Sequence, residues 1–136
     1  MNSLLSGRDV LVVEDEPLLR KRLSRFLKEE GAHVVSVESF TAAKKALSSM
    51  PFDYALFDVH LPDGLGVDLL DYSNDTSCIM MTADGGWEIA VEAMKRGAAD
   101  YMAKPFELQE VPLILARCAK AKRSRRSQEH RVEMEA

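Results

Sequence analysis

The stretch Phe52-Asp53-Tyr54-Ala55-Leu56-Phe57-Asp58 decides the fold, because it is an apolar run that ends in a carboxylate. A short apolar run of this kind is typical of a buried strand. The residues that follow, Val59-His60-Leu61-Pro62-Asp63-Gly64, have the composition of a loop rich in turns. In an open parallel sheet, ligands bind beyond the carboxyl ends of the strands, so an acid at the end of a strand is a candidate ligand-binding residue.

Four further apolar runs flank this strand, and amphipathic segments separate them. Leu19, Leu23 and Leu27, for example, recur at helical spacing after the first run. Strands that alternate with helices predict an α/β fold, in which a parallel sheet carries helices on both faces. We expect strands at about Asp9–Glu14, His33–Val37, Tyr54–Phe57, Cys78–Thr82 and Asp100–Ala103, and helices from Pro17 to a glycine end at Gly31, at about Thr41–Ser49, Val67–Tyr72 and Trp87–Arg96, and from about Glu107 towards Lys122.

The last of these helices contains a proline that an uninterrupted helix does not accommodate. Pro112 lies about one turn inside it, where the missing N–H and the ring are costly. Two interpretations are open. Either a short turn at Glu107–Glu110 precedes a helix that begins at Pro112, or the helix is kinked there.

The composition is that of one globular domain without a membrane span. The 136 residues are 46% hydrophobic and 29% charged, and no apolar run approaches 18 residues. Cys78 and Cys118 have neither metal-ligand spacing nor the density of a disulfide scaffold, so we expect two reduced core thiols in a cytoplasmic protein. Residues 1–116 hold 11 Lys and Arg against 19 Asp and Glu, whereas residues 117–136 hold 7 against 3, so an acidic body carries a basic tail.

Polar groups of complementary chemistry lie at the ends of several expected strands. They are the carboxylates of Glu14, Asp15 and Asp58, the hydroxyl of Thr82 and the ammonium of Lys104. The carboxyl ends of parallel strands share one rim of the sheet, so we expect these groups to meet. Crowded carboxylates raise each other's pKa unless a cation is present. Oxygen ligands suit Mg²⁺, which also binds phosphate oxygens, so the pattern predicts a cation and phosphate site that contains a nucleophile.

Four motifs give the chain its resemblance to the receiver domain of two-component response regulators. They are Val13-Glu14-Asp15-Glu16, Asp58 followed by Leu61-Pro62-Asp63-Gly64, Met81-Thr82-Ala83, and Lys104-Pro105-Phe106. The resemblance covers about residues 8–120, the expected receiver domain, and leaves 121–136 as a basic helical extension or a truncated linker. It implies a flavodoxin-like, doubly wound (βα)5 fold with strand order 2-1-3-4-5. The stretch Trp87–Phe106 most resembles receivers of the nitrogen-regulation, enhancer-binding activator type.

The resemblance implies a covalent phosphorylation site. Asp58 would be the phosphoacceptor for a sensor histidine kinase or a phosphotransfer protein. Mg²⁺ (or Mn²⁺) would be bound by Asp15, Asp58 and the backbone carbonyl of His60, with Glu14 acting through a water. The domain would then catalyse only its own phosphorylation and dephosphorylation, and would act on no separate substrate.

Further residues take family roles around the phosphoryl group. Lys104 would pair with one phosphoryl oxygen, Thr82 would hydrogen-bond another, and the small Ala83 would leave room for the group. His60 and Asp84 flank the expected path of the hydrolytic water, so we expect them to set the lifetime of the phosphorylated state.

The resemblance also implies a switch. Thr82 would report phosphorylation by moving to the phosphoryl group, and Tyr101 would turn inward, although a half-buried strand aromatic explains Tyr101 equally well. The surface formed by about residues 87–96, 100–103 and the helix from 107 would change shape. It would control an output, which we expect to be transcription, through homodimerisation or a C-terminal effector domain missing from this chain.

Other functions fit the same residues less well. A phosphatase of the haloacid-dehalogenase type also uses an aspartate after a strand, but it requires a second aspartate where this chain has His60. A pseudo-receiver scaffold would not need Asp15, Asp58, Thr82 and Lys104 together. A nucleotide-binding domain would need a glycine-rich loop after the first strand. The basic segment Lys120–Arg126 lacks interleaved aromatics, so we expect no direct nucleic-acid binding by the receiver and no membrane contact.

Overall fold

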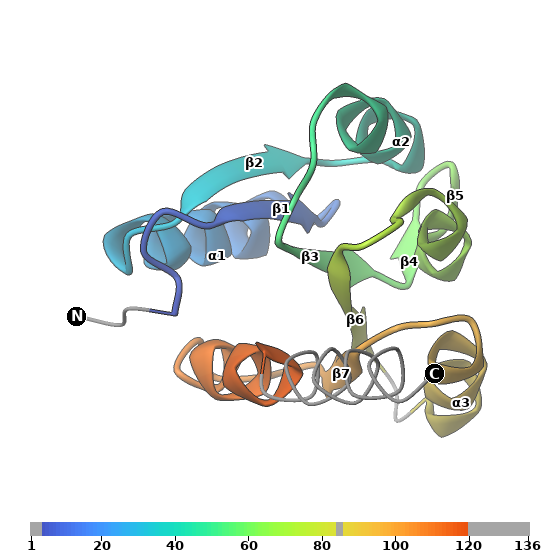
Figure 1. Cartoon of the computed structure of the whole chain (residues 1–136). Helices are drawn as coiled ribbons and strands as arrows, with labels where there is room; N and C mark the ends of the chain where they lie inside the picture. Colours follow the sequence, from blue (N-terminus) through green and yellow to red (C-terminus); the bar gives the residue numbers. More distant parts are fainter. Residues whose placement is uncertain (1–3, 84–85, 120–136) are drawn as a thin grey trace, which may run out of the picture.

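A computed structural model of the chain describes residues 4–83 and 86–119 (Figure 1). Its centre is a five-stranded sheet with the order β2-β1-β3-β6-β7, and every neighbouring pair in it is parallel. Counted along the chain, these five strands have the predicted order 2-1-3-4-5. The strands are β1 (Asp9–Val13), β2 (His33–Val37), β3 (Tyr54–Asp58), β6 (Ser77–Thr82) and β7 (Asp100–Ala103).

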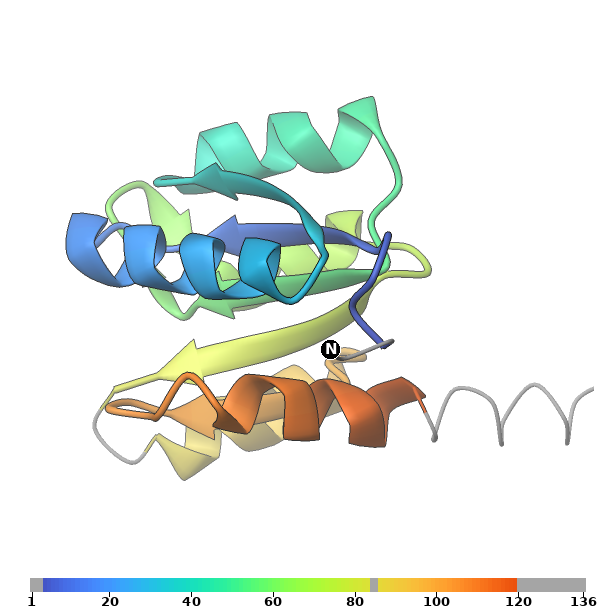
Figure 2. The ribbon, with the colours of Figure 1, turned by 90° about the vertical axis from the view of Figure 1, so that its left-hand side faces the viewer.

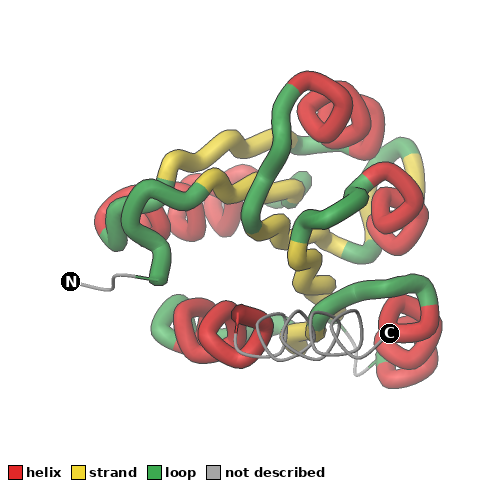
Figure 3. Tube along the Cα trace, in the orientation of Figure 1, coloured by secondary structure: helices red, strands yellow, loops and turns green. Residues whose placement is uncertain are grey.

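Helices cover both faces of this sheet, as predicted for a doubly wound fold. In Figure 1, α1 and the orange C-terminal helix lie on one side, and α2, the 3₁₀ helix η1 and α3 lie on the other. Figure 3 separates the same layers by colour, with yellow strands between red helices. The helices are α1 (Pro17–Glu29), α2 (Phe40–Ser49), η1 (Gly66–Tyr72), α3 (Trp87–Lys95) and the C-terminal helix over residues 110–119.

The alternation of side chains along each strand produces two separate cores. Val10 and Val12 of β1 face the core beneath α1 and the C-terminal helix, whereas Leu11 and Val13 face the core beneath α2, η1 and α3. Successive strand residues point to opposite faces, so β1, which is buried on both, is apolar throughout its last four residues. Both cysteines are buried thiols, as predicted.

Several local features differ from the sequence-based expectations. The segment after Asp58, expected to be a loop, forms a small antiparallel pair of β4 (His60–Leu61) and β5 (Gly64–Leu65). The helix after it is 3₁₀. Strand β1 ends at Val13, one residue before the expected end, because Glu14 already belongs to the connection to α1.

The C-terminal helix resolves the two interpretations of Pro112. A turn at residues 107–109 precedes it, with the N–H of Glu110 bonded to the carbonyl of Glu107 at 3.0 Å, and the helix begins at residue 110 rather than at Pro112. Pro112 therefore lies in the first turn, where a backbone N–H has no helical partner and a proline is tolerated. The basic extension at 121–136 lies outside the described residues. No helix in the described part of the chain is long and apolar enough to cross a membrane.

Candidate functional site

Three carboxylates meet at the carboxyl ends of the central strands. The arrows of the five-stranded parallel sheet run the same way in Figure 2, so these ends lie along one side of the sheet. Glu14 and Asp15 follow β1, Asp58 is the last residue of β3, and the two strands are neighbours. One carboxylate oxygen from each of these three residues lies within 4.8 Å of the others. The predicted convergence of these acids is therefore present in the fold.

The ammonium of Lys104, which follows the edge strand β7, also lies at this cluster. Lys104 follows β7, and its backbone N–H donates to the carbonyl of Thr82 at 2.7 Å, which holds it beside the end of β6. Its Nζ donates to Oε1 of Glu14 and lies 3.4 Å from Oδ1 of Asp58. Glu14 is completely buried, so the ammonium offsets a carboxylate that water does not reach.

The environment of Asp58 disfavours its ionised form. Burial raises the pKa of Asp58 to about 7 from an ordinary 3.8. A hydrogen bond with Glu14, repulsion from the Glu14 charge and a hydrogen bond with Asp15 act in the same direction, and Lys104 opposes them. A divalent cation among these oxygens would favour the ionised form. The donor set consists of hard carboxylate oxygens, which fits Mg²⁺ or Mn²⁺.

This raised pKa predicts that the metal-free protein loses stability as the pH rises from about 4 to about 7. In that interval the folded state retains the Asp58 proton that the unfolded chain has released, so the free energy of unfolding falls with increasing pH. Thermal unfolding in the presence of a chelator measures the trend. Asp58→Asn is expected to flatten it, and a slope that this substitution leaves unchanged would contradict the assignment.

The remaining predicted site residues lie around the cluster with different exposures. Thr82 is buried, and its hydroxyl donates to the carbonyl of Ala83 at 3.0 Å. His60 is exposed, and its backbone N–H lies 3.4 Å from Oδ1 of Asp58. Tyr101 is 45% exposed on the edge strand β7, so it is not turned inward. Asp84 lies outside the described residues.

Sequence reasoning missed Gly66, which packs against the backbone of Asp58. A Cβ atom at this position would lie 2.0 Å from the carbonyl oxygen of Asp58, and the Gly66 N–H donates to the carbonyl of Val59 at 2.7 Å. Only a glycine allows the chain to pass this close to the residue that ends β3. The glycine pair at 64 and 66, so soon after Asp58, was the available signal for a close backbone approach.

Asp63 also has a role that the sequence did not reveal. Its carboxylate accepts from the backbone N–H groups of Phe40 and Thr41 at 2.7 and 3.0 Å, and from the Thr41 hydroxyl at 2.7 Å. These hydrogen bonds lower the pKa of Asp63, and the bond from the Thr41 hydroxyl contributes most. These contacts fix the hairpin after Asp58 to the first turn of α2. The helix begins at Phe40, one residue before the expected start, because Ser39 caps it by accepting from the Ala42 N–H at 3.1 Å.

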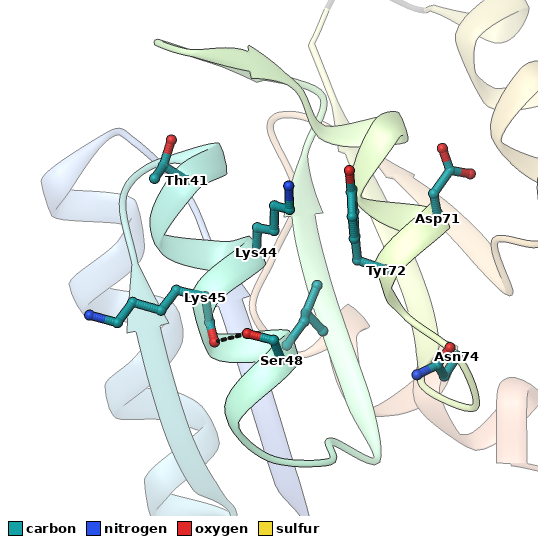
Figure 4. Close-up of a pocket in the computed structure, with 8 residues that line it drawn as sticks. Thr41, Lys44, Lys45, Ser48, Asp71, Tyr72 and Asn74 are labelled. Carbon is teal, nitrogen blue, oxygen red and sulfur yellow. Dashed lines mark hydrogen bonds between the residues drawn. The ribbon is translucent and has the colours of Figure 1, made fainter.

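A separate hollow of about 500 Å³ lies between α2 and η1. Figure 4 shows Lys44 facing the ring of Tyr72 across it, and the Lys44 Nζ lies 4.7 Å from the ring centroid. None of the cluster residues lines this hollow. The chemistry at the end of β3 therefore depends on the acid cluster and not on this pocket.

Comparison with known proteins agrees with this geometry. Residues 10–116 match the family described as the response regulator receiver domain. The chain belongs to this family. The receiver is 34% identical over 116 residues to the response regulator protein PilR and 40% identical over 114 residues to FleR, both of Pseudomonas aeruginosa. These matches cover 82% and 81% of this chain. They cover only 26% and 24% of PilR and FleR, so the chain spans about a quarter of those proteins.

Solved structures show the same fold in related receivers. NtrX from Brucella abortus matches with a TM-score of 0.81 and 26% identity over 91% of this chain and 29% of that one. The beryllofluoride-activated NtrC4 receiver domain dimer matches with a TM-score of 0.75 and 34% identity over 81% of this chain and 94% of that one. The similarity to receivers of the nitrogen-regulation type is thereby confirmed.

Proposed function

We propose that the receiver accepts a phosphoryl group on Asp58 from a sensor histidine kinase or a phosphotransfer protein, and that Mg²⁺ or Mn²⁺ is required. The observation that carries the proposal is the position of Asp58 at the end of β3. Carboxylate oxygens of Glu14 and Asp15 lie within 4.8 Å of it, and the ammonium of Lys104 lies 3.4 Å away. A nucleophile, a cation site and a positive charge for a phosphoryl oxygen thus share one rim.

In the proposed reaction an Asp58 oxygen attacks the phosphorus of a phosphohistidine. The bond from Oδ to phosphorus forms as the bond from phosphorus to the donor imidazole nitrogen breaks, and the histidine leaves. Asp15 and Asp58 would hold the cation directly, together with the backbone carbonyl of His60, and Glu14 would act through a water. The bound cation would neutralise charge on the equatorial phosphoryl oxygens.

Two side chains would exchange their present partners for the phosphoryl group. Lys104 now pairs with Glu14 and Asp58, and it would pair with a phosphoryl oxygen. The Thr82 hydroxyl, now bonded to the carbonyl of Ala83, would donate to another. This movement would vacate space beside β7, into which the exposed ring of Tyr101 would turn.

The proposed output surface combines α3, β7 and the C-terminal helix. It exposes several large apolar side chains, which favours contact with a second copy of the receiver or with an effector domain. These are Trp87, Val91, Met94, Tyr101 and Leu113. The match covers only about a quarter of PilR and FleR, which supports a C-terminal effector in the whole protein and transcription as its output. Such a signalling role implies a cytoplasmic protein.

The lifetime of the phosphorylated state is expected to depend on His60 and Asp84. A ring at position 60 and an acid at position 84 would restrict the water that attacks the phosphoryl group, so replacing both by alanine should shorten the half-life several-fold. Loss of the phosphoryl mass after removal of the donor gives the rate. A half-life equal to that of the parent would refute the role of both residues.

The direct test of the proposed function is phosphorylation by a small phosphodonor such as acetyl phosphate. With Mg²⁺ the intact mass should increase by one phosphoryl group, and with a chelator it should not. Sustained turnover of a generic phosphomonoester would instead indicate a phosphatase. Binding of partners without any labelling under these conditions would indicate a pseudo-receiver.

A further inference from the structure

The guanidinium of Arg20 contacts the backbone of Glu14 and Asp15, in the loop between β1 and α1. Its Nη1 lies 2.8 Å from the carbonyl oxygen of Glu14 and 3.4 Å from that of Asp15. Its Nη2 lies 3.7 Å from the carboxylate of Glu38, just beyond the end of β2. The Arg20 side chain is only 20% exposed. A single side chain therefore connects α1, the acid-bearing loop and the end of the neighbouring strand.

These contacts are not needed to begin the helix. The carboxylate of Glu16 already caps α1 by accepting from the N–H groups of Leu18 and Leu19 at 3.1 and 2.7 Å, and Pro17 occupies the first helical turn. Arg20 is instead directed backwards, at the peptide groups on either side of Asp15. Its planar fork directs Nη1 to both carbonyl oxygens and Nη2 towards Glu38 at the same time, which the single nitrogen of a lysine cannot do.

The position of those two carbonyl groups governs where the acids point. The carbonyl of Glu14 and the carbonyl of Asp15 bracket the Cα of Asp15, so fixing both peptide planes fixes the direction in which the Asp15 side chain leaves the backbone. Asp15 is exposed, and among the described residues only the interaction with Asp58 restrains its carboxylate. Its orientation thus depends on the backbone that Arg20 holds.

We propose that Arg20 is a positioning residue for the divalent-cation site, which it serves by holding the Glu14-Asp15 backbone without touching the ion. The inference rests on the proposed function, because it concerns the same cation. Residues that orient metal ligands from outside the coordination sphere commonly change metal affinity by roughly 10-fold or more when they are removed.

The sign of the effect separates positioning from simple electrostatics. The guanidinium is a positive charge close to a site for a positive ion, so removal of that charge alone would strengthen cation binding. Loss of the backbone contacts would weaken it. Arg20→Met removes both the charge and the contacts, whereas Arg20→Lys keeps the charge and loses the fork.

The experiment measures Mn²⁺ affinity by electron paramagnetic resonance, which reports free Mn²⁺ and needs no phosphodonor. Arg20→Met is expected to weaken Mn²⁺ binding by roughly 10-fold, and Arg20→Lys by a smaller factor in the same direction. Arg25→Met is the matched control, because Arg25 lies on the same helix and, within the part of the chain that the structure describes, pairs only with Glu29, at 3.4 Å. Glu38→Gln removes the outer ion pair of Arg20 and leaves the carbonyl contacts. Both controls should remain within about twofold of the parent.

A second readout excludes a merely structural effect. The rate of labelling by acetyl phosphate should need more Mg²⁺ in Arg20→Met and recover at saturating Mg²⁺, with little change in the thermal midpoint measured in chelator. Equal or tighter Mn²⁺ binding by Arg20→Met overturns the inference while the proposed function stands. If that variant does not fold, Arg20→Lys decides in the same way. A parent protein that binds no Mn²⁺ overturns the proposed function itself.

Discussion

Asp58→Asn is expected to abolish phosphoryl transfer to the receiver. An amide oxygen is a poor nucleophile, and Glu14 is not expected to replace Asp58, because it is fully buried and bonded to Lys104. Intact-mass measurement with acetyl phosphate and Mg²⁺ should show a fully labelled parent and a variant at background. Labelling of Asp58→Asn to the parental extent would show that another residue is the phosphoacceptor, and Asp15 would be the first to examine.

Asp53→Asn is the matched control for this experiment. Asp53 lies just before β3, at the opposite end of the strand from Asp58, where its carboxylate accepts from the Asp9 N–H at 2.9 Å and lies 3.9 Å from Arg8. Like Asp58→Asn, this substitution replaces an aspartate by an asparagine. It should leave labelling unchanged, so a loss of labelling in both variants would point to general damage to the fold.

Gly66→Ala is expected to lower the free energy of unfolding by about 3 kcal/mol, because the added methyl group would meet backbone and not a flexible side chain. Its Cβ would lie 2.0 Å from the carbonyl oxygen of Asp58 and 2.9 Å from the carbonyl carbon, so the chain from Asp58 to His60 must shift. The same shift displaces the nucleophile, and labelling by acetyl phosphate should fall with stability. Urea unfolding measures the first effect.

Gly86→Ala provides the comparison. A Cβ at Gly86 would lie 3.3 Å from the Thr82 hydroxyl, which is the end of a side chain, and Gly86 has a negative φ of −69°. This substitution should cost at most about 1 kcal/mol. Equal stability losses in the two alanine variants would show that the contact between Gly66 and Asp58 is not the reason that position 66 carries glycine.

Most of the fold followed from patterns that act locally along the sequence. The apolar run ending at Asp58 became the buried strand β3, and the boundaries predicted for β2 and β7 are those of the structure. Their positions depend on hydrophobic periodicity, which the sequence shows directly. The convergence of Asp15, Asp58 and Lys104 followed from one topological rule, that parallel strands present their carboxyl ends together.

The missed features depend on contacts between residues that are distant in the sequence. The Asp63 carboxylate contacts the first turn of α2 from 22 and 23 residues away, and the local sequence, in which Ser39 supplies the cap, does not reveal that contact. The hairpin of β4 and β5 is too short for periodicity to reveal. The contacts of Arg20 with carbonyl groups are set by how α1 turns back on the preceding loop, and residue spacing alone does not give that direction.

The most direct test of the central claim is a crystal structure of the receiver with Mg²⁺ and beryllofluoride, a stable mimic of a phosphoryl group that activates the related NtrC4 receiver. The account predicts beryllium bound to an Asp58 oxygen. One fluorine should lie beside the Lys104 ammonium and another beside the Thr82 hydroxyl, and the cation should lie between Asp15 and Asp58. Beryllofluoride bound elsewhere, or a cation held without Asp15 and Asp58, would contradict it.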